Sequence, residues 1–278
     1  LYSIYKNDHI KSKRPVQRLK SVYANVASIL FIPLFITGIL IAGYKKYNSG
    51  IEPDDPVSST IYAPMGSRVS FNLPDGTTGM LNSGSRLDYS IPFTSDRKVT
   101  LEGEAWFNVK SDEDHPFKIM TGDLLVRVLG TSFNICAYSP EKYIEIVLEE
   151  GKMELVNNRN NEIIMMNPAE RLFYQDGIIK KTLTDPKKYY AWTEGKLIFK
   201  GDPMKEVIRR IERWYNVKIE ISDPELLDYS LWGTFEDDKL EDVMRFLSMT
   251  SPLKYRITPR ELLPDSTLSK EKVIIGKR

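Results

Sequence analysis

The chain has 278 residues, of which 28% are charged and 41% hydrophobic, a balance that excludes wholesale disorder and at this length suggests about two domains. The single cysteine excludes an internal disulfide, and two histidines leave few groups for metal binding or general-base catalysis. The formal net charge is +1, and no basic stripe follows position 44, which argues against nucleic acid as a partner.

Residues 22–44, VYANVASILFIPLFITGILIAGY, contain no charged side chain. As a helix this stretch would span about 34 Å, enough to cross a hydrocarbon core about 30 Å thick. The alternative interpretation is a cleaved signal peptide, but the apolar part of such a peptide normally runs about 7–15 residues. Pro33 is compatible with a span, because transmembrane helices tolerate such breaks. The sequence therefore predicts a single transmembrane helix at 22–44.

The charges on either side of this span predict its orientation. Only Lys45 and Lys46 follow it closely, before the acidic EPDDP, whereas several basic residues precede it: Lys6, Lys11, Lys13, Arg14, Arg18 and Lys20. The positive-inside rule then places residues 1–21 in the cytoplasm and residues 45–278 outside it. In a Gram-negative cell this describes a single-pass inner-membrane protein with periplasmic domains.

An all-β domain is predicted at 61–183, after a linker at 45–60 that is rich in turn-forming residues and proline. Short β runs in this region are separated by turn signals such as PDGT and QDG, in which glycine supplies positive φ. Alternation of apolar and polar residues is visible in VTLEGEAWFNV. We expect short antiparallel strands in a solenoid or sandwich-like arrangement.

A small α+β domain is predicted at 187–278, built from two strand–helix–strand repeats. In the first repeat Asp202 is the predicted N-cap and Pro203 the first helical residue. One helix face is marked by apolar residues at helical spacing: Met204, Val207, Ile208 and Ile211.

The same pattern recurs 36 residues later, where Asp238 aligns with Asp202 and begins a second helix in a capping-box-like context with Glu241. Its apolar face aligns with the first: Leu240, Val243, Met244 and Leu247. Each unit is too small to bury its own helix face, so we expect the two copies to pack into one domain.

Catalytic residues are sparse. His115 lies in the loop SDEDHPF and is interpreted as a solvated loop residue. Glu102 and Glu104 would share one face of a strand, as in a hydrolase carboxylate pair, although such pairs normally flank a cleft from separate elements. Metal-ligand spacings and phosphate-binding motifs are absent from the sequence. We expect a binding protein without enzymatic activity, metal or cofactor, with a hydrolase as the weaker alternative.

The first alternative is a membrane-anchored periplasmic glycan-binding module, which would bind sugar through residues 61–183. Separately, several aromatic residues are candidates for a carbohydrate platform: Trp192, Trp214, Trp232 and Tyr215. Trp214 lies at helix-face spacing, so core packing is the preferred interpretation for it.

The only cysteine lies in TSFNICAY, whose alternation places Phe133, Ile135 and Ala137 inward and Cys136 on the opposite face. We expect a half-exposed thiol with no base beside it. A bulge or bend is expected at 130–131, where the alternation breaks.

Several consecutive motifs resemble those of FecR-type anti-sigma regulators: LPDGT, LN-x-x-S, LEGEAWF-x-V, HPF-x-I and VLGT-x-FN-x-x-AY. The later AWTEGKLIFKGDPMKEVIRRIERWYNVKIEI is similar to the C-terminal domain of the Bacteroidetes branch, which is related to the secretin/TonB N-terminal signalling fold. The resemblance covers residues 61–258.

This resemblance implies cell-surface signalling. A periplasmic signalling domain of a TonB-dependent outer-membrane receptor would bind the periplasmic part, and an extracytoplasmic-function sigma factor would respond in the cytoplasm. The family's sigma-binding bundle is far longer than residues 1–21, so either these residues are a stub of a truncated anti-sigma region or sigma binding resides elsewhere.

For the receptor domain, edge-strand addition to the α+β domain is the expected mode of binding. The candidate edge is YSLWGTF, with Trp232 as a possible anchor. The candidate partner-binding residues are Tyr229, Leu231, Trp232, Gly233 and Phe235. A charge or proline at position 231 or 233 is expected to abolish capture without unfolding the protein.

Overall fold

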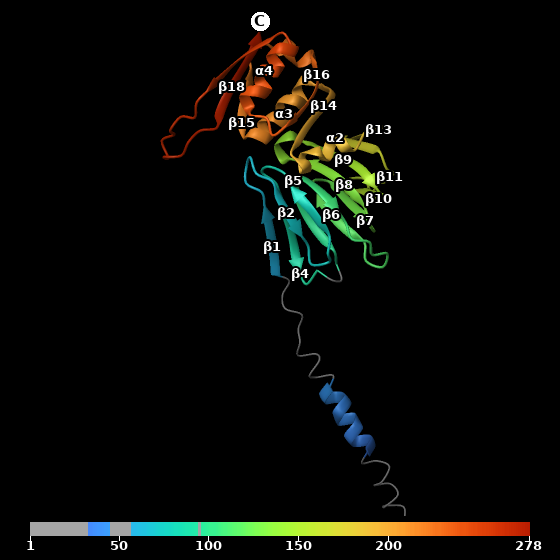
Figure 1. Ribbon diagram of the computed structural model, residues 1–278. Coiled ribbons are helices and arrows are strands. Elements are labelled where there is room, and N and C mark those ends of the chain that lie inside the picture. Colours follow the sequence, from blue (N-terminus) through green and yellow to red (C-terminus); the bar gives the residue numbers. More distant parts are fainter. Residues whose placement is uncertain (1–32, 45–56, 94–95) are drawn as a thin grey trace, which may run out of the picture. The chain divides into compact units, whose positions relative to one another are not determined.

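The computed structural model describes residues 33–44, 57–93 and 96–278, which belong to two compact units, 1–55 and 56–278 (Figure 1). The first unit is described as one helix over residues 33–44. Within the described ranges, no helix has both the length and the apolar character that a membrane crossing requires. Residues 22–32 of the predicted span, the stub at 1–21 and the linker residues 45–56 lie outside them, so the transmembrane helix stays a prediction.

The region from 57 to 183 is all β, as predicted. Its strands are β1 (Val57–Tyr62), β2 (Val69–Asn72), β3 (Thr78–Leu81), β4 (Arg86–Ile91), β5 (Lys98–Asn108), β6 (Phe117–Thr121), β7 (Leu124–Val128), β8 (Ser132–Ala137), β9 (Tyr143–Glu150), β10 (Met153–Asn157), β11 (Ile163–Met166), β12 (Glu170–Gln175) and β13 (Ile178–Leu183). The predicted linker is too long at its end, because residues 57–60 already pair with β4 as part of β1. We call this region the β module.

All 13 strands of the β module form one continuous, curled sheet (Figure 1). The sheet has two halves, and strand β5 belongs to both of them. The first part of β5 pairs with β4 and β6, and its second part pairs with β3 and β8. The β module is therefore a single curled, half-barrel sheet with β5 running through both halves, and not the solenoid or sandwich-like arrangement that was expected.

The expectation of purely antiparallel strands is wrong at one place, since β6 runs parallel to β5. The connection through residues 109–116 carries the chain back before β6 begins, so β6 starts at the same end as β5. All other strand pairs in the β module are antiparallel among the described residues.

The two parts of β5 meet at Gly103, whose φ of +103° favours glycine. A Cβ atom at this position would lie 2.4 Å from Ser85 Oγ and 2.7 Å from Ser85 Cα. Only a residue without a side chain fits there, so Gly103 is the hinge that lets one strand serve both halves.

Alternate residues of the strands point into a single hydrophobic core. Phe107 lies at its centre, stacked on Phe133 at 5.4 Å between ring centroids and in contact with Phe71 and Phe117. These aromatic side chains come from both halves of the sheet, so the core closes only when β5 has turned the two halves toward each other.

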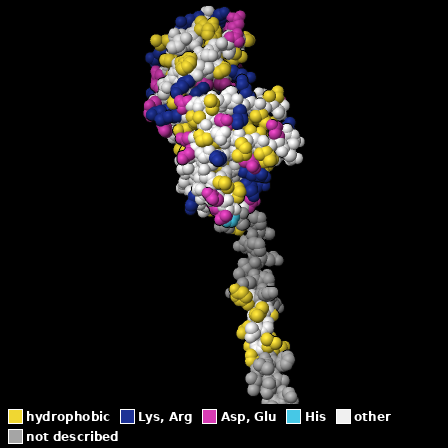
Figure 2. Space-filling model, turned by 90° about the vertical axis from the view of Figure 1, so that its right-hand side faces the viewer, with side chains coloured by type: hydrophobic (Ala, Val, Ile, Leu, Met, Phe, Trp, Pro, Cys, Tyr) yellow, Lys and Arg dark blue, Asp and Glu magenta, His cyan; other side chains and the backbone are white. Residues whose placement is uncertain are grey.

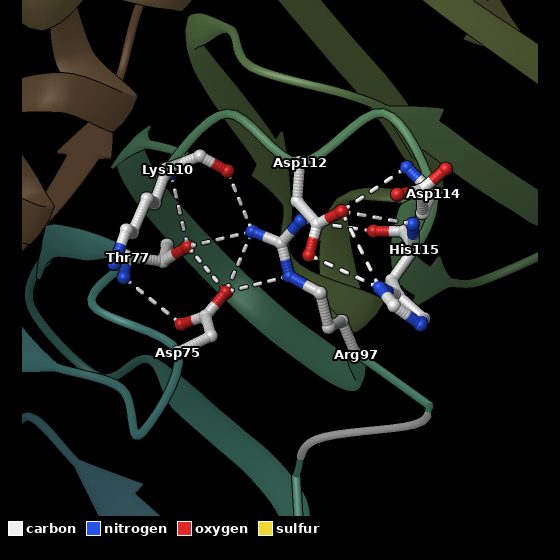
Figure 3. Close-up of polar contacts among 7 residues, drawn as sticks. All are labelled: Asp75, Thr77, Arg97, Lys110, Asp112, Asp114 and His115. Carbon is white, nitrogen blue, oxygen red and sulfur yellow. Dashed lines mark hydrogen bonds and ion pairs between the residues drawn. The ribbon is translucent and has the colours of Figure 1, made fainter.

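A buried arginine ties together two of the loops (Figure 3). Arg97 is 2% exposed, pairs with Asp75 at 2.7 Å and donates to the backbone oxygens of Lys110 and His115. Thr77 completes the PDGT turn by donating to Asp75 at 2.7 Å. Arg97 therefore links the PDGT turn to the loop that contains SDEDHP.

Residues 187–278 form the α+β module. Its elements are α2 (Lys187–Tyr190), the 3₁₀ turn η2 (Ala191–Glu194), β14 (Lys196–Pro203), α3 (Met204–Tyr215), β15 (Val217–Ile221), η3 (Pro224–Asp228), β16 (Ser230–Glu236), α4 (Leu240–Thr250), β17 (Leu253–Thr258) and β18 (Glu271–Lys277). The first strands of the two repeats, β14 and β16, pair with each other, while β15 and β17 flank β18. Strand β18 was not predicted from the sequence.

The predicted helix faces are confirmed, since the buried residues of α3 and α4 are the eight that the repeat alignment selects: Met204, Val207, Ile208, Ile211, Leu240, Val243, Met244 and Leu247. They share one core with residues of both small sheets. The two repeats therefore pack into one domain, as expected.

The predicted N-caps are each wrong by one residue. Asp202 stays in β14, where its carboxylate accepts from the backbone N–H of Lys200 at 2.8 Å and pairs with Lys188 at 2.6 Å. Helix α3 begins at Met204, whose N–H donates to the carbonyl of Tyr229 at 2.8 Å. Helix α4 likewise has Lys239 at its N-cap, because the Asp238 carboxylate accepts from the backbone of Glu236 instead.

Replacement of Gly103 by alanine is expected to destabilise the β module strongly. The Gly177→Ala variant is the matched control, because Gly177 has a φ of +82° but no atom lies within 4 Å of the position that its Cβ would occupy. We expect a loss of about 1–2 kcal/mol for Gly177→Ala from the backbone alone, and about 1–3 kcal/mol more for Gly103→Ala from the clash with Ser85. Urea denaturation measures both, and equal losses would contradict the hinge role of Gly103.

Candidate partner-binding site

The five residues proposed to bind a partner lie on or beside β16. Leu231, Trp232, Gly233 and Phe235 belong to the strand, and Tyr229 precedes it. Strand β16 pairs with β14 alone among the strands that the structure describes, so its other edge carries unpaired main-chain groups. This is the geometry that strand addition requires.

The side chains divide into two sets because alternate residues of a strand point to opposite faces. Leu231 is 2% exposed and Phe235 is 7% exposed, and both pack in the core of the α+β module. Trp232 points to the other face and is exposed, and Tyr229, which precedes the strand, is also exposed. A charge at Leu231 would therefore disrupt the core, so the expectation that such a variant stays folded is wrong.

Trp232 is 70% exposed, yet its ring is held in place by Gly201 of β14. A Cβ atom at Gly201 would lie 3.1 Å from the indole ring, and Gly201 has a φ of +72° at a break in the register with β16. The indole thus lies against bare backbone with most of its surface in solvent. Gly201 is not among the predicted site residues, although its position directly before the predicted helix start was a signal in the sequence.

The four aromatic residues considered for a carbohydrate platform do not form one. Trp192 is buried, and Trp214 packs partly against the core of the α+β module with the guanidinium of Arg68 at 3.9 Å from its ring centre. Tyr215 also packs against that core, which leaves Trp232 alone as a strongly exposed ring of the four. The interpretation of Trp214 as a packing residue is confirmed.

The two carboxylates on β5 lie in different halves of the sheet. Glu102 is exposed and accepts from Ser139 Oγ at 2.8 Å. Glu104 is buried and accepts from the side-chain amides of Asn82 at 2.7 Å and Asn134 at 3.0 Å. Their surroundings differ, and both oxygens of Glu104 are occupied, so they do not form the free pair that a hydrolase would use.

The other residues considered for catalysis or metal binding do not form a site among the described residues either. The His115 ring lies 3.2 Å from the carboxylate of Asp112 on an exposed loop, which confirms it as a loop residue (Figure 3). Within the described residues, no group of three or more His, Cys, Asp or Glu side chains is placed to hold a metal ion. On the face drawn in Figure 2, basic and acidic side chains are interspersed.

Cys136 is 2% exposed, so the expectation of a half-exposed thiol is wrong. The alternation was interpreted correctly, but the outer face of β8 is covered by the α+β module. Cys136 lines a cavity of about 500 Å³ between the modules, together with Asp202, Arg210 and Arg213. Burial, and then the charge of Glu104, raise the pKa of the thiol well above its usual range.

A chain of hydrogen bonds joins the two modules through Asn134. The indole N–H of Trp192 donates to Asn134 Oδ1 at 3.1 Å, and Asn134 Nδ2 donates to Glu104. Glu104 in turn accepts from Asn82. Trp192 is 3% exposed and Asn134 is 2% exposed, so this link is shielded from water.

Arginines of α3 complete the junction. Arg213 pairs with Glu141 at 2.5 Å and lies over the ring of Tyr138 at 4.9 Å. Arg209 lies over the ring of Tyr143 at 5.3 Å. The two hydrophobic cores are separate clusters, and the junction between them is polar. An interface of this kind permits relative motion more readily than a large apolar one.

Two family models match successive parts of the chain. The model described as FecR protein matches residues 59–154, and the model described as FecR, C-terminal matches residues 196–263. The second range contains β14 and β16 with all five candidate residues.

Two crystal structures, at 1.65 Å and 2.50 Å resolution, of a Parabacteroides distasonis ATCC 8503 protein assigned as an anti-sigma factor are similar to this chain. In both cases 32% of the residues are identical. The first has a TM-score of 0.69 and covers 79% of this chain and 99% of that one. The second has a TM-score of 0.68 and covers 80% and 100%. No curated protein matches the chain significantly.

The Trp192→Phe variant is expected to lose about 1–3 kcal/mol of stability, because phenylalanine leaves Asn134 Oδ1 buried without its donor. Trp232→Phe is the matched control, since that indole is exposed and its loss should change stability by less than about 0.5 kcal/mol. Chemical denaturation monitored by circular dichroism compares the two. An equal loss in both variants would show that the junction hydrogen bond adds nothing.

The thiol of Cys136 is expected to be unreactive while the modules remain docked, because burial both hides it and raises its pKa. Iodoacetamide at about pH 8 should modify the native protein at least about 100-fold more slowly than the urea-unfolded protein. The chain has one cysteine, so the modified mass reports this position alone. Similar rates in the two states would show that the α+β module does not cover β8.

Proposed function

Because the chain belongs to the FecR family, we propose that it is an anti-sigma regulator that relays a periplasmic signal across the inner membrane. The anti-sigma role is supported by both family models and by the similarity to the P. distasonis protein. The proposed partners are the periplasmic signalling domain of a TonB-dependent outer-membrane receptor and a cytoplasmic extracytoplasmic-function sigma factor. These partners follow from the motifs that the chain shares with the family.

The proposed placement in the membrane is supported by the sequence. Residues 22–44 carry no charge and are long enough to span, and the basic residues precede them. Residues 1–21 would then contact the cytoplasm, and both the β module and the α+β module would occupy the periplasm.

The free edge of β16 is the observation that best supports receptor binding. A strand added there would satisfy main-chain groups that pair with no other strand among the described residues. The new strand would lengthen the sheet of β14 and β16, and it needs no movement of the core beneath. Affinity would come from backbone hydrogen bonds and specificity from the side chains beside them.

Trp232 is the proposed anchor of this contact. Exposed tryptophans are enriched among the residues that dominate binding energy, because they bury a large area with little loss of side-chain freedom. Contact with Gly201 already restricts the indole, so less entropy would be lost when a partner covers it. Tyr229 extends the exposed aromatic surface at the start of the strand.

The proposal includes no catalytic step. Support comes from the candidates themselves: Glu104 is occupied by two amides, His115 contacts Asp112, and the thiol of Cys136 is buried with a raised pKa. Relay of a signal requires no catalysis, but it requires that the contact between the β module and the α+β module changes. Helix α3 contacts β16 and also carries Arg213 of the junction, so it connects the proposed binding edge with the β module.

Trp232→Lys is expected to reduce capture of the receptor signalling domain by at least about 30-fold, which corresponds to about 2 kcal/mol. Lysine removes the aromatic anchor and would place a charge in an apolar contact. The measurement is crosslinking in cell envelopes with the full chain as bait, followed by titration with the signalling domain of the receptor recovered.

Ile178→Lys is the matched control, because Ile178 is 73% exposed but lies on β13 of the β module. It should capture the receptor domain as well as the unaltered chain does. Undiminished capture by Trp232→Lys would exclude the β16 edge as the site. Recovery of no TonB-dependent receptor by the unaltered chain would contradict the proposed partner.

A further inference from the structure

Strand β1 forms one edge of the curled sheet in the β module. Among the strands that the structure describes it pairs with β4 alone, and Figure 1 shows it at the border of the β module. A free edge of this kind is a template for pairing with another strand. Proteins normally protect such an edge with charged side chains or proline, or they cover it.

The edge of β1 lacks this protection. The described strands of six or more residues that have a single strand partner are β1, β13, β14, β16 and β17. Of these, β1 alone contains no charged side chain, since its sequence is VSSTIY. Its edge is therefore the one of this set that a like strand can approach without meeting a charge.

Two of the shorter edge strands are protected by side chains from elsewhere. Lys181 donates to the carbonyl of Met165 on β11 at 2.9 Å. Glu212 accepts from the backbone N–H of Ile219 on β15 at 2.8 Å. Both contacts occupy main-chain groups that an added strand would need, and they show how this chain blocks other edges.

The direction of the main-chain groups in β1 follows from its ladder with β4. The N–H of Ala63, directly after β1, donates to the carbonyl of Ser85 at 2.9 Å. Main-chain groups along a strand point alternately to its two sides, so those of Ser58, Thr60 and Tyr62 point away from β4. The side chains of these three residues are exposed as well.

We propose that β1 pairs antiparallel with β1 of a second copy of this chain, so that two curled sheets join edge to edge. A two-fold axis through Thr60 places this residue opposite its own counterpart and places Ser58 opposite Tyr62 of the other copy. All three residues direct their main-chain groups to the free edge, so the pairing forms about six hydrogen bonds.

The occupant is a second copy because β1 complements itself. In this register threonine faces threonine, which is a favourable cross-strand pair, and no like charges lie opposite each other. On the neighbouring β4, Arg86 and Asp88 neutralise each other at 2.8 Å, so this pair favours no partner of either charge. Val57 and Tyr62, which are 60% and 54% exposed at the two ends of β1, would lose exposed area.

This contact goes beyond the proposed anti-sigma function and does not depend on it, and it leaves the edge of β16 free. The test uses the full chain in detergent, studied by sedimentation velocity from about 1 to 200 μM. A dimer is expected with a dissociation constant on the order of 50 μM or tighter, as suits a small interface. A chain that stays monomeric over this range overturns the proposal.

A proline variant locates the contact. Ser58→Pro removes an N–H that β4 does not use, and an edge strand tolerates proline at such a position, so the fold should be kept. Dimerisation should weaken at least about 10-fold, because two of the three paired positions lose a donor or a close approach. Circular dichroism checks the fold, and undiminished dimerisation would place the contact elsewhere and overturn the proposal.

Leu183→Pro is the matched control. Leu183 is exposed on β13, another strand with one partner. The N–H of Thr184 donates to the carbonyl of Ala169, so by alternation the N–H of Leu183 points away from β12. This variant should dimerise as well as the unaltered chain does, and an equal loss in both proline variants would contradict the role of β1.

A cysteine variant identifies the occupant without relying on the proline variant. Opposed Cα atoms in a hydrogen-bonded antiparallel pair lie about 5.5 Å apart, within the range of a disulfide. Because Cys136 is buried, mild oxidation of Thr60→Cys should join two copies through position 60. Ile178→Cys, at an exposed position on β13, is the control and should give no covalent dimer. In cell envelopes, absence of the Thr60→Cys dimer, or a crosslink to a different protein in its place, overturns the proposal.

Discussion

The bend at Gly103 is the constraint on which the β module depends. Strand β5 pairs with β4 and β6 before the bend and with β3 and β8 after it, so one strand holds both halves of the sheet. Phe117 of one half reaches Phe107 of the other half across this bend.

The two modules are joined by a different kind of contact. Each has its own hydrophobic core, whereas Asn134, Trp192, Arg213 and Glu141 make the junction polar. Hydrophobic burial stabilises each module by itself, and the junction adds directional bonds that specify one docked arrangement. A regulator that must change state benefits from this division, because the modules can shift without exposing either core.

Local patterns predicted a large part of this structure. The eight buried residues of α3 and α4 follow from helical periodicity and from the repeat, and the turn signals separate the strands of the β module. The candidate edge strand, YSLWGTF, was also predicted from the sequence. Its division into buried Leu231 and exposed Trp232 required the register with β14, and the contact with Gly201 required the bulge in that strand.

The sequence by itself determined the all-β and α+β modules, the repeat and the family, because periodicity, turn residues and motifs act over short distances along the chain. Only the tertiary structure decided the environment of Cys136, the partners of Asp202 and the parallel pairing of β6. Each of these depends on a segment distant in sequence. The alternation around Cys136 is the same whether its outer face meets water or other side chains, so only the structure shows that Tyr143 and the α+β module cover the thiol.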